Sequence, residues 1–221
     1  MRANKVFFIT ATDTGAGKTV TTFCLGVLLK NLGRNVGVMK PVQCAGQDAQ
    51  FLKRALGLKD ESSLINPFYA PEPLSPHLAF RRAKISFDRR RVQGCLKELC
   101  ARHEIVLVEG AGGLLAPITD ACYNADLVAD LKAELIIVAR TGLGTINHTL
   151  LTISEAKKRR LKIKGIIFCQ TGPAKGSLPE KTNPKEIERL SGIKVIGTIP
   201  YMKPLTQKSI LQQCQNLKLN I

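Results

Sequence analysis

A turn near the N-terminus combines glycines with a lysine and a threonine, in the segment ATDTGAGKT at residues 11–19. The apolar residues 6–9 predict a strand before it, and residues 20–32 predict a helix after it. In that setting the N–H groups of the turn and of the helix N-terminus bind phosphate, and Lys18 adds a positive charge. The Thr19 hydroxyl is a ligand for magnesium bound to the phosphates. The segment therefore predicts a nucleotide-binding loop.

One position departs from the common form of such a loop, because Thr12 stands where a glycine is usual. The alternative interpretation is a glycine-containing turn between a strand and a helix that binds nothing. That alternative explains the glycines, but it gives no reason for Lys18 and Thr19 at the start of the helix. We therefore expect this loop to bind a nucleotide.

Charged side chains also follow two later apolar runs. Glu109 follows residues 105–108, where a carboxylate can reach magnesium held by Thr19; a carboxylate that caps a turn is the alternative. Lys40 closes a short apolar run and is a candidate for stabilising negative charge in phosphoryl transfer; a lysine with a buried stem and a solvated ammonium is the alternative. Asp48 is a second candidate metal ligand, or the N-cap of its own helix.

Apolar runs alternate with amphipathic segments along the chain. The predicted strands are residues 6–9, 36–39, 105–108, 135–138, 165–168 and 195–197. The predicted helices are residues 20–32, 48–56, 92–100 and 126–131, and one that opens at 142–148 and runs to about 160. This order predicts an α/β fold with a doubly wound, mostly parallel sheet of the P-loop NTPase kind, as a single domain over residues 1–221.

Ligands of such sheets bind beyond the carboxyl ends of the strands. Five polar residues stand at or just after predicted strand ends, so we expect them to converge on one edge: Lys18, Lys40, Glu109, Arg140 and Cys169. The proline-rich residues 60–86 show little periodicity and predict a long surface loop, of a kind that is often functional.

Composition limits the class of protein. Hydrophobic residues make up 44% of the chain and charged residues 23%, as in ordinary globular proteins, and no apolar run is long enough to cross a membrane. The N-terminus shows no signal-peptide pattern. The seven cysteines include no C-x-x-C pair, which favours free thiols in a reducing cytoplasm. We therefore expect a cytoplasmic protein without a membrane partner.

The formal charge is +16, with basic clusters at residues 89–91 and 157–160. Such a balance suits either a solvated basic surface or non-specific binding of nucleic acid. Aromatic residues are only 5% of the chain, and no basic stretch has aromatic residues interleaved for base stacking. We favour the solvated surface and expect no nucleic-acid partner.

Several short motifs, taken in order, resemble the dethiobiotin synthetase family. They run nearly from end to end of the chain, and their order and spacing are more specific than any one of them. The motifs occupy residues 12–14 with 17–19, 40–42, 66–68 with 73–77, 108–113, 142–148 and 197–201.

The resemblance implies an ATP-dependent cyclo-ligase of biotin synthesis. In that family CO2 adds to one amine of 7,8-diaminononanoate to give a carbamate, whose oxygen attacks the γ-phosphate of ATP. A carbamic-phosphoric anhydride results, and the second amine then closes the ring of dethiobiotin and expels phosphate. The resemblance therefore implies Mg2+ as cofactor, ATP as co-substrate and a homodimer with the substrate near the subunit interface.

The same resemblance assigns roles to residues of this chain. The implied catalytic residues, which hold the carbamate and stabilise the transferred phosphoryl group, are Lys40, Lys18 and Thr14. The implied magnesium ligands are Thr19, Asp48 and Glu109. The implied nucleotide contacts are Gly15, Ala16, Gly17, Lys18, Thr19, Val20, Asp48, Glu109, Gly110, Ala111, Gly112, Cys169, Gln170, Ile199, Pro200 and Tyr201. The implied substrate contacts are Lys40 and Cys44, with Leu143, Gly144 and Asn147 of the second subunit.

The chain departs from the family pattern at three positions. Ala11 stands where glycine is usual, which indicates either a φ below zero there or a slightly altered loop. Cys44 replaces the usual Ser or Thr beside the substrate, which weakens a hydrogen bond. Cys169 replaces an asparagine that reads the adenine edge and is followed by Gln170, so the nucleotide preference is open.

A second class of protein also fits the loop and the charge. Partition-type P-loop switch ATPases bind DNA through a basic surface and make no small-molecule product. They carry a signature lysine five residues before the lysine that corresponds to Lys18, and this chain has Asp13 there. The ligase is therefore the favoured interpretation.

Overall fold

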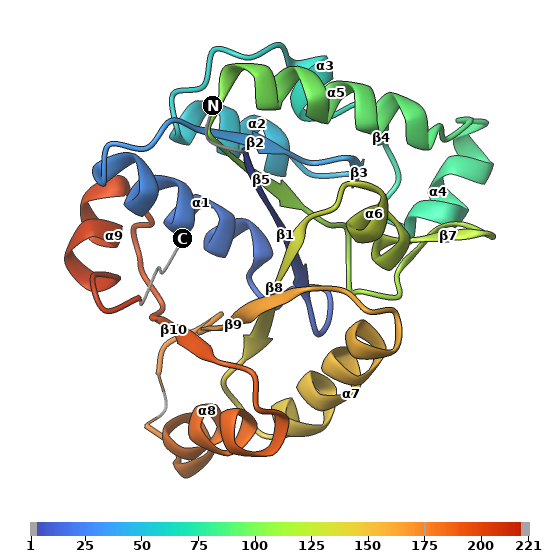
Figure 1. Cartoon of the computed structure of the whole chain (residues 1–221). Helices are drawn as coiled ribbons and strands as arrows, with labels where there is room; N and C mark the ends of the chain where they lie inside the picture. The colour runs from blue at the N-terminus through green and yellow to red at the C-terminus, as the bar shows by residue number, and fades with distance from the viewer. Residues whose placement is uncertain (1–3, 175, 218–221) are drawn as a thin grey trace.

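The structure is a computed structural model that describes residues 4–174 and 176–217. Its centre is a six-stranded parallel sheet in the order β10-β9-β8-β1-β5-β2 (Figure 1). The strands are β1 (Lys5–Ala11), β2 (Val36–Met39), β5 (Ile105–Glu109), β8 (Glu134–Arg140), β9 (Ile163–Cys169) and β10 (Val195–Ile199). Most of their side chains are buried, as expected for parallel strands covered on both faces. The predicted α/β fold with a doubly wound parallel sheet is confirmed.

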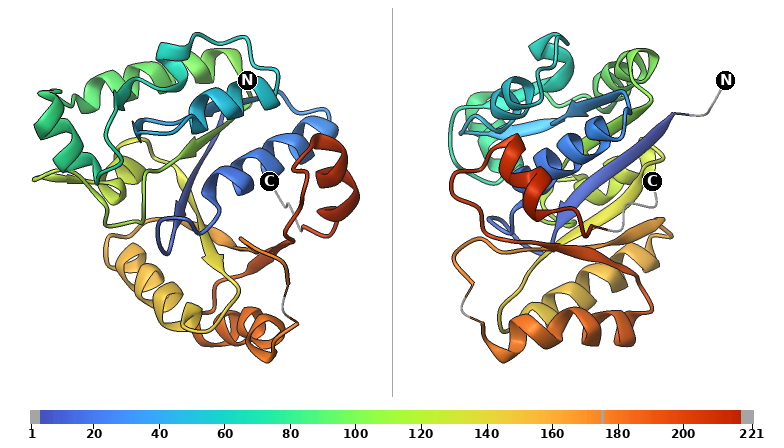
Figure 2. Two further views of the ribbon diagram at one scale, coloured as in Figure 1. Left: turned by 180° about the vertical axis from the view of Figure 1, so that it is seen from behind. Right: turned by 90° about the vertical axis from the view of Figure 1, so that its left-hand side faces the viewer.

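Helices cover both faces of this sheet (Figures 1 and 2). One face carries α1 (Lys18–Asn31), α2 (Asp48–Ala55) and α9 (Gln207–Gln213). The other carries α4 (Pro76–Ala83), α5 (Arg89–Arg102), α6 (Asn124–Asp130), α7 (Thr145–Lys158) and α8 (Leu178–Ser191). Each face therefore has its own apolar core, and the sheet separates the two cores.

The register of the central strands brings the site residues together. Ile9 of β1 lies opposite Glu109 of β5 on one side and Ile136 of β8 on the other. The turn that follows β1 therefore lies next to the carboxyl end of β5. Ala11 has no positive φ, which agrees with the expectation for that position.

The expectation of a long loop over residues 60–86 is wrong. That stretch holds α3 (Ser62–Ile65), the short strand β4 (Phe68–Ala70) and α4. β4 pairs with β3 (Val42–Cys44) in a two-stranded parallel sheet, and Pro76 lies in the first turn of α4, where a proline costs no hydrogen bond. These elements are too short for periodicity to reveal, and the proline marks a helix start.

Helices α8 and α9 were also not predicted from periodicity. α8 begins at a capping box in which the Ser177 N–H donates to Glu180 Oε2 at 3.1 Å, and it contains Pro184. A small antiparallel pair, β6 (Pro117–Thr119) with β7 (Cys122–Tyr123), completes the elements of residues 4–174 and 176–217. In that part of the chain, no helix combines the length and apolarity needed to cross a membrane.

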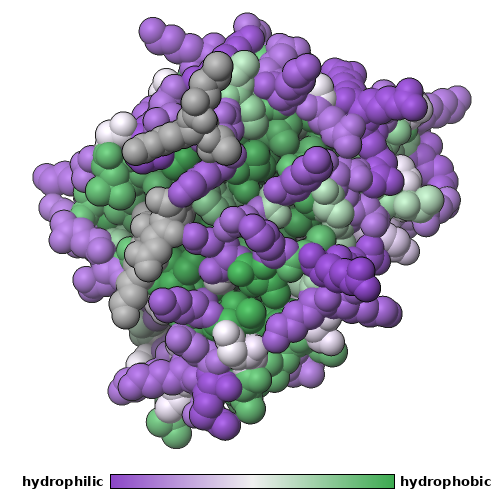
Figure 3. Space-filling view, in the orientation of Figure 1, coloured by the Kyte–Doolittle hydropathy of each residue, from purple (hydrophilic) through white to green (hydrophobic). Residues whose placement is uncertain are grey.

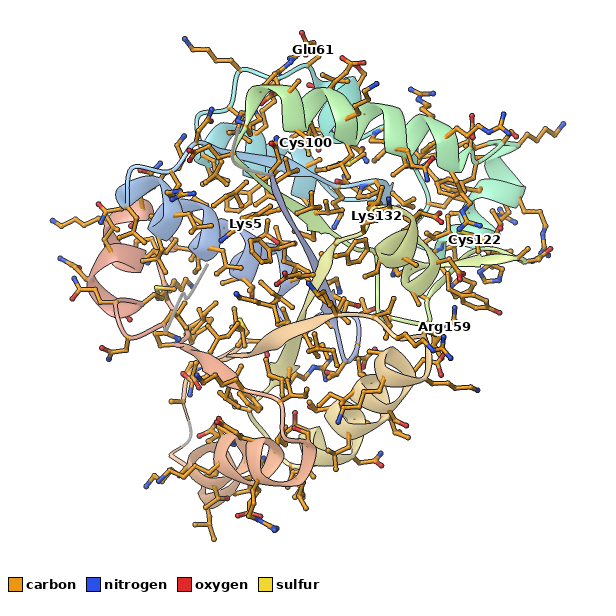
Figure 4. The ribbon with its side chains drawn as sticks, in the orientation of Figure 1. Lys5, Glu61, Cys100, Cys122, Lys132 and Arg159 are labelled. Carbon is orange, nitrogen blue, oxygen red and sulfur yellow. The ribbon has the colours of Figure 1, made fainter. Side chains whose placement is uncertain are left out.

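Ion pairs between helices occupy part of the two basic clusters. Arg89 lies 2.5 Å from Asp130, which joins α5 to α6. Arg159, which lies just after α7 and is labelled in Figure 4, pairs with Glu155 at 2.5 Å and with Asp126 at 2.9 Å. Because of these ion pairs, the two arginines are partly neutralised and hold helices in place. Other hydrophilic side chains project around the edge of the face in Figure 3, with apolar side chains between them.

Candidate nucleotide and substrate site

A cavity of about 1040 Å³ opens at the carboxyl ends of the parallel strands. The expected residues that line it are Thr14, Gly15, Gly17, Lys18, Thr19, Val20, Lys40, Cys44, Asp48, Glu109, Ala111, Gly112, Cys169, Gln170, Pro200 and Tyr201. Every strand that contributes to this set is parallel to its neighbour, so the strand ends converge on one edge as expected. The cavity is large enough for a nucleotide and a second small molecule.

The loop after β1 leaves the start of α1 open to an anion. Gly17 is the N-cap of α1 with φ +96°, and no side chain caps the helix or places an acid in its first turn. The free N–H groups of that turn therefore have no partner within the helix and suit phosphate oxygens. A Cβ at Gly17 would overlap the Cys169 sulfur, so only glycine fits between the loop and β9.

Lys40 lies at the centre of a buried polar cluster beside this loop. Its Nζ is 2.5 Å from Glu109 Oε1 and 2.8 Å from Asp48 Oδ2. The Thr19 hydroxyl donates to Glu109 Oε1 at 2.9 Å. Glu109 is completely buried and Lys40 is 4% exposed. The four residues that the sequence placed near the transferred phosphoryl group thus form one connected cluster.

The two lysines of the site are in different electrostatic environments. Burial acts to lower the pKa of Lys40, but the carboxylates of Glu109 and Asp48 outweigh it, so this pKa lies above its ordinary value. Burial lowers the pKa of Lys18 from 10.5 to about 8; Glu109 opposes that shift, and the charge of Lys40 adds to it. Lys18 therefore gains from an anion such as a phosphate, because its charge is only partly compensated.

The donor set fits magnesium. Glu109 Oε2 is buried and has no hydrogen-bond partner, so one oxygen of this carboxylate is free to take a ligand. Two carboxylates and a hydroxyl, from Asp48, Glu109 and Thr19, are hard oxygen ligands of the type Mg2+ prefers. Among the residues that the structure describes, no three or more His, Cys, Asp or Glu side chains are grouped so that they could hold a metal ion by themselves. The remaining positions therefore suit phosphate oxygens and water.

Gln43 positions Asp48, although it belongs to none of the motifs of the sequence. Its amide donates to the Gly46 carbonyl at 2.9 Å and accepts from the Ala49 N–H at 2.9 Å. The side chain is 1% exposed, and its two hydrogen bonds support the turn that leads into α2. A buried glutamine with both ends satisfied holds this turn, and hence Asp48, in place.

Asn124 supports the glycine-rich turn after β5 in a similar way. Its side-chain amide donates to the carbonyl oxygens of Ala111 and Gly113, at 2.6 and 2.7 Å. Gly112 between them has φ +71°, which the turn requires. The turn that lines the cavity next to Glu109 is therefore fixed by a residue at the start of α6.

Cys169, beside Gly17 of the loop, is 1% exposed, and burial raises the pKa of its thiol to about 11. Gln170 accepts a hydrogen bond from the Tyr201 N–H at 3.3 Å, and its own N–H donates to the Ile199 carbonyl at 3.0 Å. These contacts tie the segment after β9 to the segment after β10. The region assigned to the base is thus built from two neighbouring strand ends.

Some expected residues lie away from this cavity. Ala16 and Ile199 are fully buried behind it, and Gly110 packs against Phe8 and Asn124. The residues expected to act from a second subunit are all exposed and do not line the cavity of their own chain: Leu143, Gly144 and Asn147. Their assignment to the substrate stays a prediction.

Other lining residues had not been assigned to the site. They are Thr12, Asp13, Gln43, Pro73, Leu74, Ser75, Pro76, Gly113, Leu114, Leu115, Ala116, Leu151, Thr152, Glu155, Thr171, Met202 and Leu205. Residues 73–76 belong to the proline-rich stretch 60–86, which was expected to be of a kind that is often functional. Their place in the lining of the cavity agrees with that expectation. Thr12, Asp13 and Gly113 belong to motifs of the sequence, and the others lie outside those motifs.

The fold and the open helix N-terminus behind the glycine turn define a P-loop nucleoside-triphosphate-binding protein. The AAA domain family matches residues 5–209. A ParA family ATPase from Chlorobium tepidum TLS superposes with a TM-score of 0.56 at 18% identity, over 99% of this chain and 96% of that chain. At that identity the likeness shows the fold alone.

Sequence relatives define the family more narrowly. The ATP-dependent dethiobiotin synthetase of Nitrosopumilus maritimus (strain SCM1) is 35% identical over 214 residues, 93% of either chain. That of Methanococcus vannielii is 37% identical over 196 residues, 88% of this chain and 92% of that protein. The chain belongs to the dethiobiotin synthetase family.

Proposed function

We propose that this protein forms dethiobiotin from 7,8-diaminononanoate, CO2 and ATP. The buried Lys40 beside the phosphate-binding loop is the observation that carries the proposal. An ammonium has three donors, and Glu109 and Asp48 use two of them. The third is left for an oxygen of the carbamate or of the transferred phosphoryl group. A positive charge fixed in advance at that place stabilises charge that develops in the transition state.

The loop residues supply the other contacts of the phosphoryl transfer. Lys18 carries a charge that its own surroundings compensate only in part, which suits the γ-phosphate. Thr14 lines the same cavity and is assigned to the carbamate. After transfer, the second amine attacks the carbonyl carbon of the anhydride, the ring closes, and phosphate leaves with the electrons of the broken C–O bond. Holding both reactants in one cavity supplies much of the rate enhancement.

Magnesium bound by Thr19, Asp48 and Glu109 would neutralise charge on the β- and γ-phosphates of ATP. The Thr19 hydroxyl and the free Glu109 Oε2 support this assignment. The Lys40 ammonium also compensates the charge of these two carboxylates.

We further propose that the active form is a homodimer. Leu143 is 94% exposed and Leu151 is 62% exposed, on the segment that leads into α7 and on α7 itself. Exposed apolar side chains that form one patch mark surfaces that a partner covers, and a second copy on this surface would cover Leu143. A second copy on this surface would bring its Gly144 and Asn147 to the far carboxylate of the diaminononanoate.

The partition-type switch ATPase is the other candidate, and the ParA-like fold is compatible with it. No observation at the site favours it. Asp13 replaces the signature lysine of that class, and arginines of both basic clusters are engaged in ion pairs between helices.

The direct test is conversion of substrates by the purified protein. The protein is incubated with 7,8-diaminononanoate, bicarbonate and Mg-ATP, and dethiobiotin is measured by mass spectrometry while ADP and phosphate are measured in parallel. We expect one dethiobiotin for each ADP. ATP hydrolysis that does not depend on the diamine and gives no dethiobiotin would refute the proposal and favour the switch ATPase.

A further inference from the structure

A hydrogen bond joins the end of β8 to the phosphate-binding loop. Arg140 is the last residue of β8, and its Nη2 donates to the Thr14 carbonyl at 2.7 Å. The same nitrogen lies 3.6 Å from Asp13 Oδ2. The guanidinium thus holds two consecutive residues of the loop. Arg140 does not line the cavity, so it contacts the loop from outside the cavity.

The contact fixes the orientation of one peptide unit. The bond between Thr14 and Gly15 is trans, so the Gly15 N–H points away from the side on which the Thr14 carbonyl meets Arg140. Gly15 has φ +71°, and it lines the cavity. A left-handed residue within such a loop makes the concave array of N–H groups that binds anions. The peptide is therefore held in the orientation that phosphate binding needs.

Asp13 completes the arrangement. Its Oδ1 accepts from the Thr14 N–H at 2.7 Å, so this N–H is turned toward the carboxylate. The carboxylate is in turn paired with Arg140. A lysine at position 13 would repel the guanidinium and could not accept that hydrogen bond. The aspartate therefore belongs to a clamp within one chain.

We propose that Arg140 is a positioning residue for the nucleotide, which clamps the Asp13–Thr14 segment so that the Gly15 N–H is presented to the phosphate chain. The proposal rests on the proposed function in that the loop binds ATP, but it concerns binding and not the ligase chemistry. Arg140 is 51% exposed in its side chain, and it touches loop backbone rather than the cavity. Loss of Arg140 should therefore weaken the binding of the nucleotide phosphates and leave the binding of the diamine unchanged.

The test compares Arg140→Gln, which loses the charge and the reach, with Arg140→Lys, which keeps one charged donor. Arg189→Gln is the matched control, because Arg189 forms an exposed pair with Glu186 on α8. Calorimetry measures binding of Mg-ADP and of inorganic pyrophosphate, and kinetics measure the KM for diaminononanoate. We expect Arg140→Gln to weaken both phosphate ligands about tenfold, with the diamine KM within about twofold. Arg140→Lys should recover most of the loss, and the control should match the wild type.

Glycine labelled with 15N gives a readout that a general loss of stability would not produce. The Gly15 amide signal should move when pyrophosphate binds to the wild type and should move much less in Arg140→Gln. If that variant does not fold, the wild-type spectrum still decides, since a Gly15 signal that pyrophosphate leaves in place overturns the proposal. Unchanged ADP binding in Arg140→Gln, or a rise confined to the diamine KM, also overturns it. A wild type that binds ADP but makes no dethiobiotin would refute the proposed function and leave this test intact.

Discussion

Lys40 and Glu109 form a buried ion pair, with Nζ and Oε1 2.5 Å apart, at the point where β2 and β5 end beside the phosphate-binding loop. Taking both charges out of water is costly, and the pair is stable only because each charge compensates the other. Lys18 differs, because no carboxylate of the described chain lies within ion-pairing distance of its ammonium, and burial lowers its pKa to about 8. The two lysines should therefore respond to substitution in opposite ways.

Replacing Lys40 should lower turnover much more than nucleotide affinity. In Lys40→Gln the fixed donor to the transferred group is lost, which typically raises the barrier by about 2.7–4 kcal/mol. The variant should also unfold more easily without ligand, because Glu109 is left buried without its partner. Steady-state kinetics, ATP calorimetry and thermal unfolding measure the three effects.

The control for this variant is Lys53→Gln on α2, which removes a lysine that donates to Ser62 and lies outside the site. It should behave as the wild type in all three measurements. If Lys40→Gln binds ATP poorly but turns over normally at saturation, Lys40 is a ground-state phosphate contact and the assigned role is wrong.

Replacing Lys18 should abolish activity without harming the fold. Lys18→Ala removes the charge that meets the γ-phosphate, so ATP binding and turnover should both be lost. Lys18→Met keeps the apolar stem and should be at least as stable as the wild type at pH 7, where the wild type holds a partly uncompensated ammonium. The pKa of Lys18 is about 8 in the folded protein, below its ordinary 10.5, so the unfolded chain binds more protons between these values. The free energy of unfolding that the Met variant gains over the wild type should therefore shrink as pH rises above 8.

Thermal unfolding of wild type and Lys18→Met at pH 7 and pH 9 measures this difference. A Met variant that is less stable at pH 7 than at pH 9, relative to the wild type, would contradict the sign of the expected effect. Unchanged turnover of Lys18→Ala would exclude the phosphate-loop interpretation as a whole.

Activity should require magnesium. Chelation by EDTA should abolish dethiobiotin formation, and excess Mg2+ should restore it, because two carboxylates and the Thr19 hydroxyl provide a hard-oxygen site. Glu109→Gln should raise the Mg2+ concentration needed for half-maximal rate by about tenfold or more. Glu104→Gln, which alters an exposed pair with Arg34, is the control. Full activity in EDTA would show that the cluster does not hold a metal.

The sequence predicted those parts of the site that rest on strand order. A strand followed by the glycine turn, and charges at the ends of apolar runs, were enough to bring Lys40 and Glu109 together, because parallel strands align their carboxyl ends. Arg140 was expected at this edge for the same reason, but its contact with the loop was not predicted. Arg140 contacts Thr14 over a separation of 126 positions. That contact depends on the side chain's path and not on any local pattern.

Short helices and strands were not predicted from the sequence for a different reason. β4 has three residues and α3 has four, and both are shorter than the stretch over which alternation reveals a strand or helical periodicity reveals a helix. Their stability comes from packing in the tertiary structure, such as Phe68 against Phe80 and Phe87. Gln43 shows a related limit within the site, since its role depends on side-chain hydrogen bonds to Gly46 and Ala49 that no pattern in the sequence indicates.

The dimer proposal predicts a selective defect at position 147. Asn147 is exposed and lies outside the cavity of its own chain, so Asn147→Ala should leave ATP binding unchanged. It should raise the KM for diaminononanoate if the side chain serves the neighbouring subunit. Leu143→Glu should break the dimer, because it places a charge on an apolar contact surface. Light scattering that shows only monomer at assay concentration, with full activity, would defeat the proposal.

The last prediction concerns the base. Recognition of adenine by an asparagine uses a donor and an acceptor at once, whereas the Cys169 thiol is a weak donor, is 1% exposed and has a pKa raised by burial to about 11. The Gln170 carbonyl is occupied by the Tyr201 N–H, which leaves its amide nitrogen as a donor. A donor alone does not distinguish the bases, because adenine, guanine and cytosine all offer acceptors. The phosphates are bound elsewhere, so the choice of base should be weak.

We therefore expect ATP to be preferred over GTP and CTP by no more than about tenfold in kcat/KM, or about 1.4 kcal/mol. Competition kinetics with the four nucleoside triphosphates measure this ratio. Cys169→Asn should raise it, because the amide restores a paired donor and acceptor, while Cys95→Asn on α5 is the control at a distance from the site. Gly17 packs against Cys169, so thermal unfolding must show that the larger side chain is tolerated. A wild-type preference for ATP of about a thousandfold would mean that Gln170 or the backbone near Tyr201 replaces the missing amide in full.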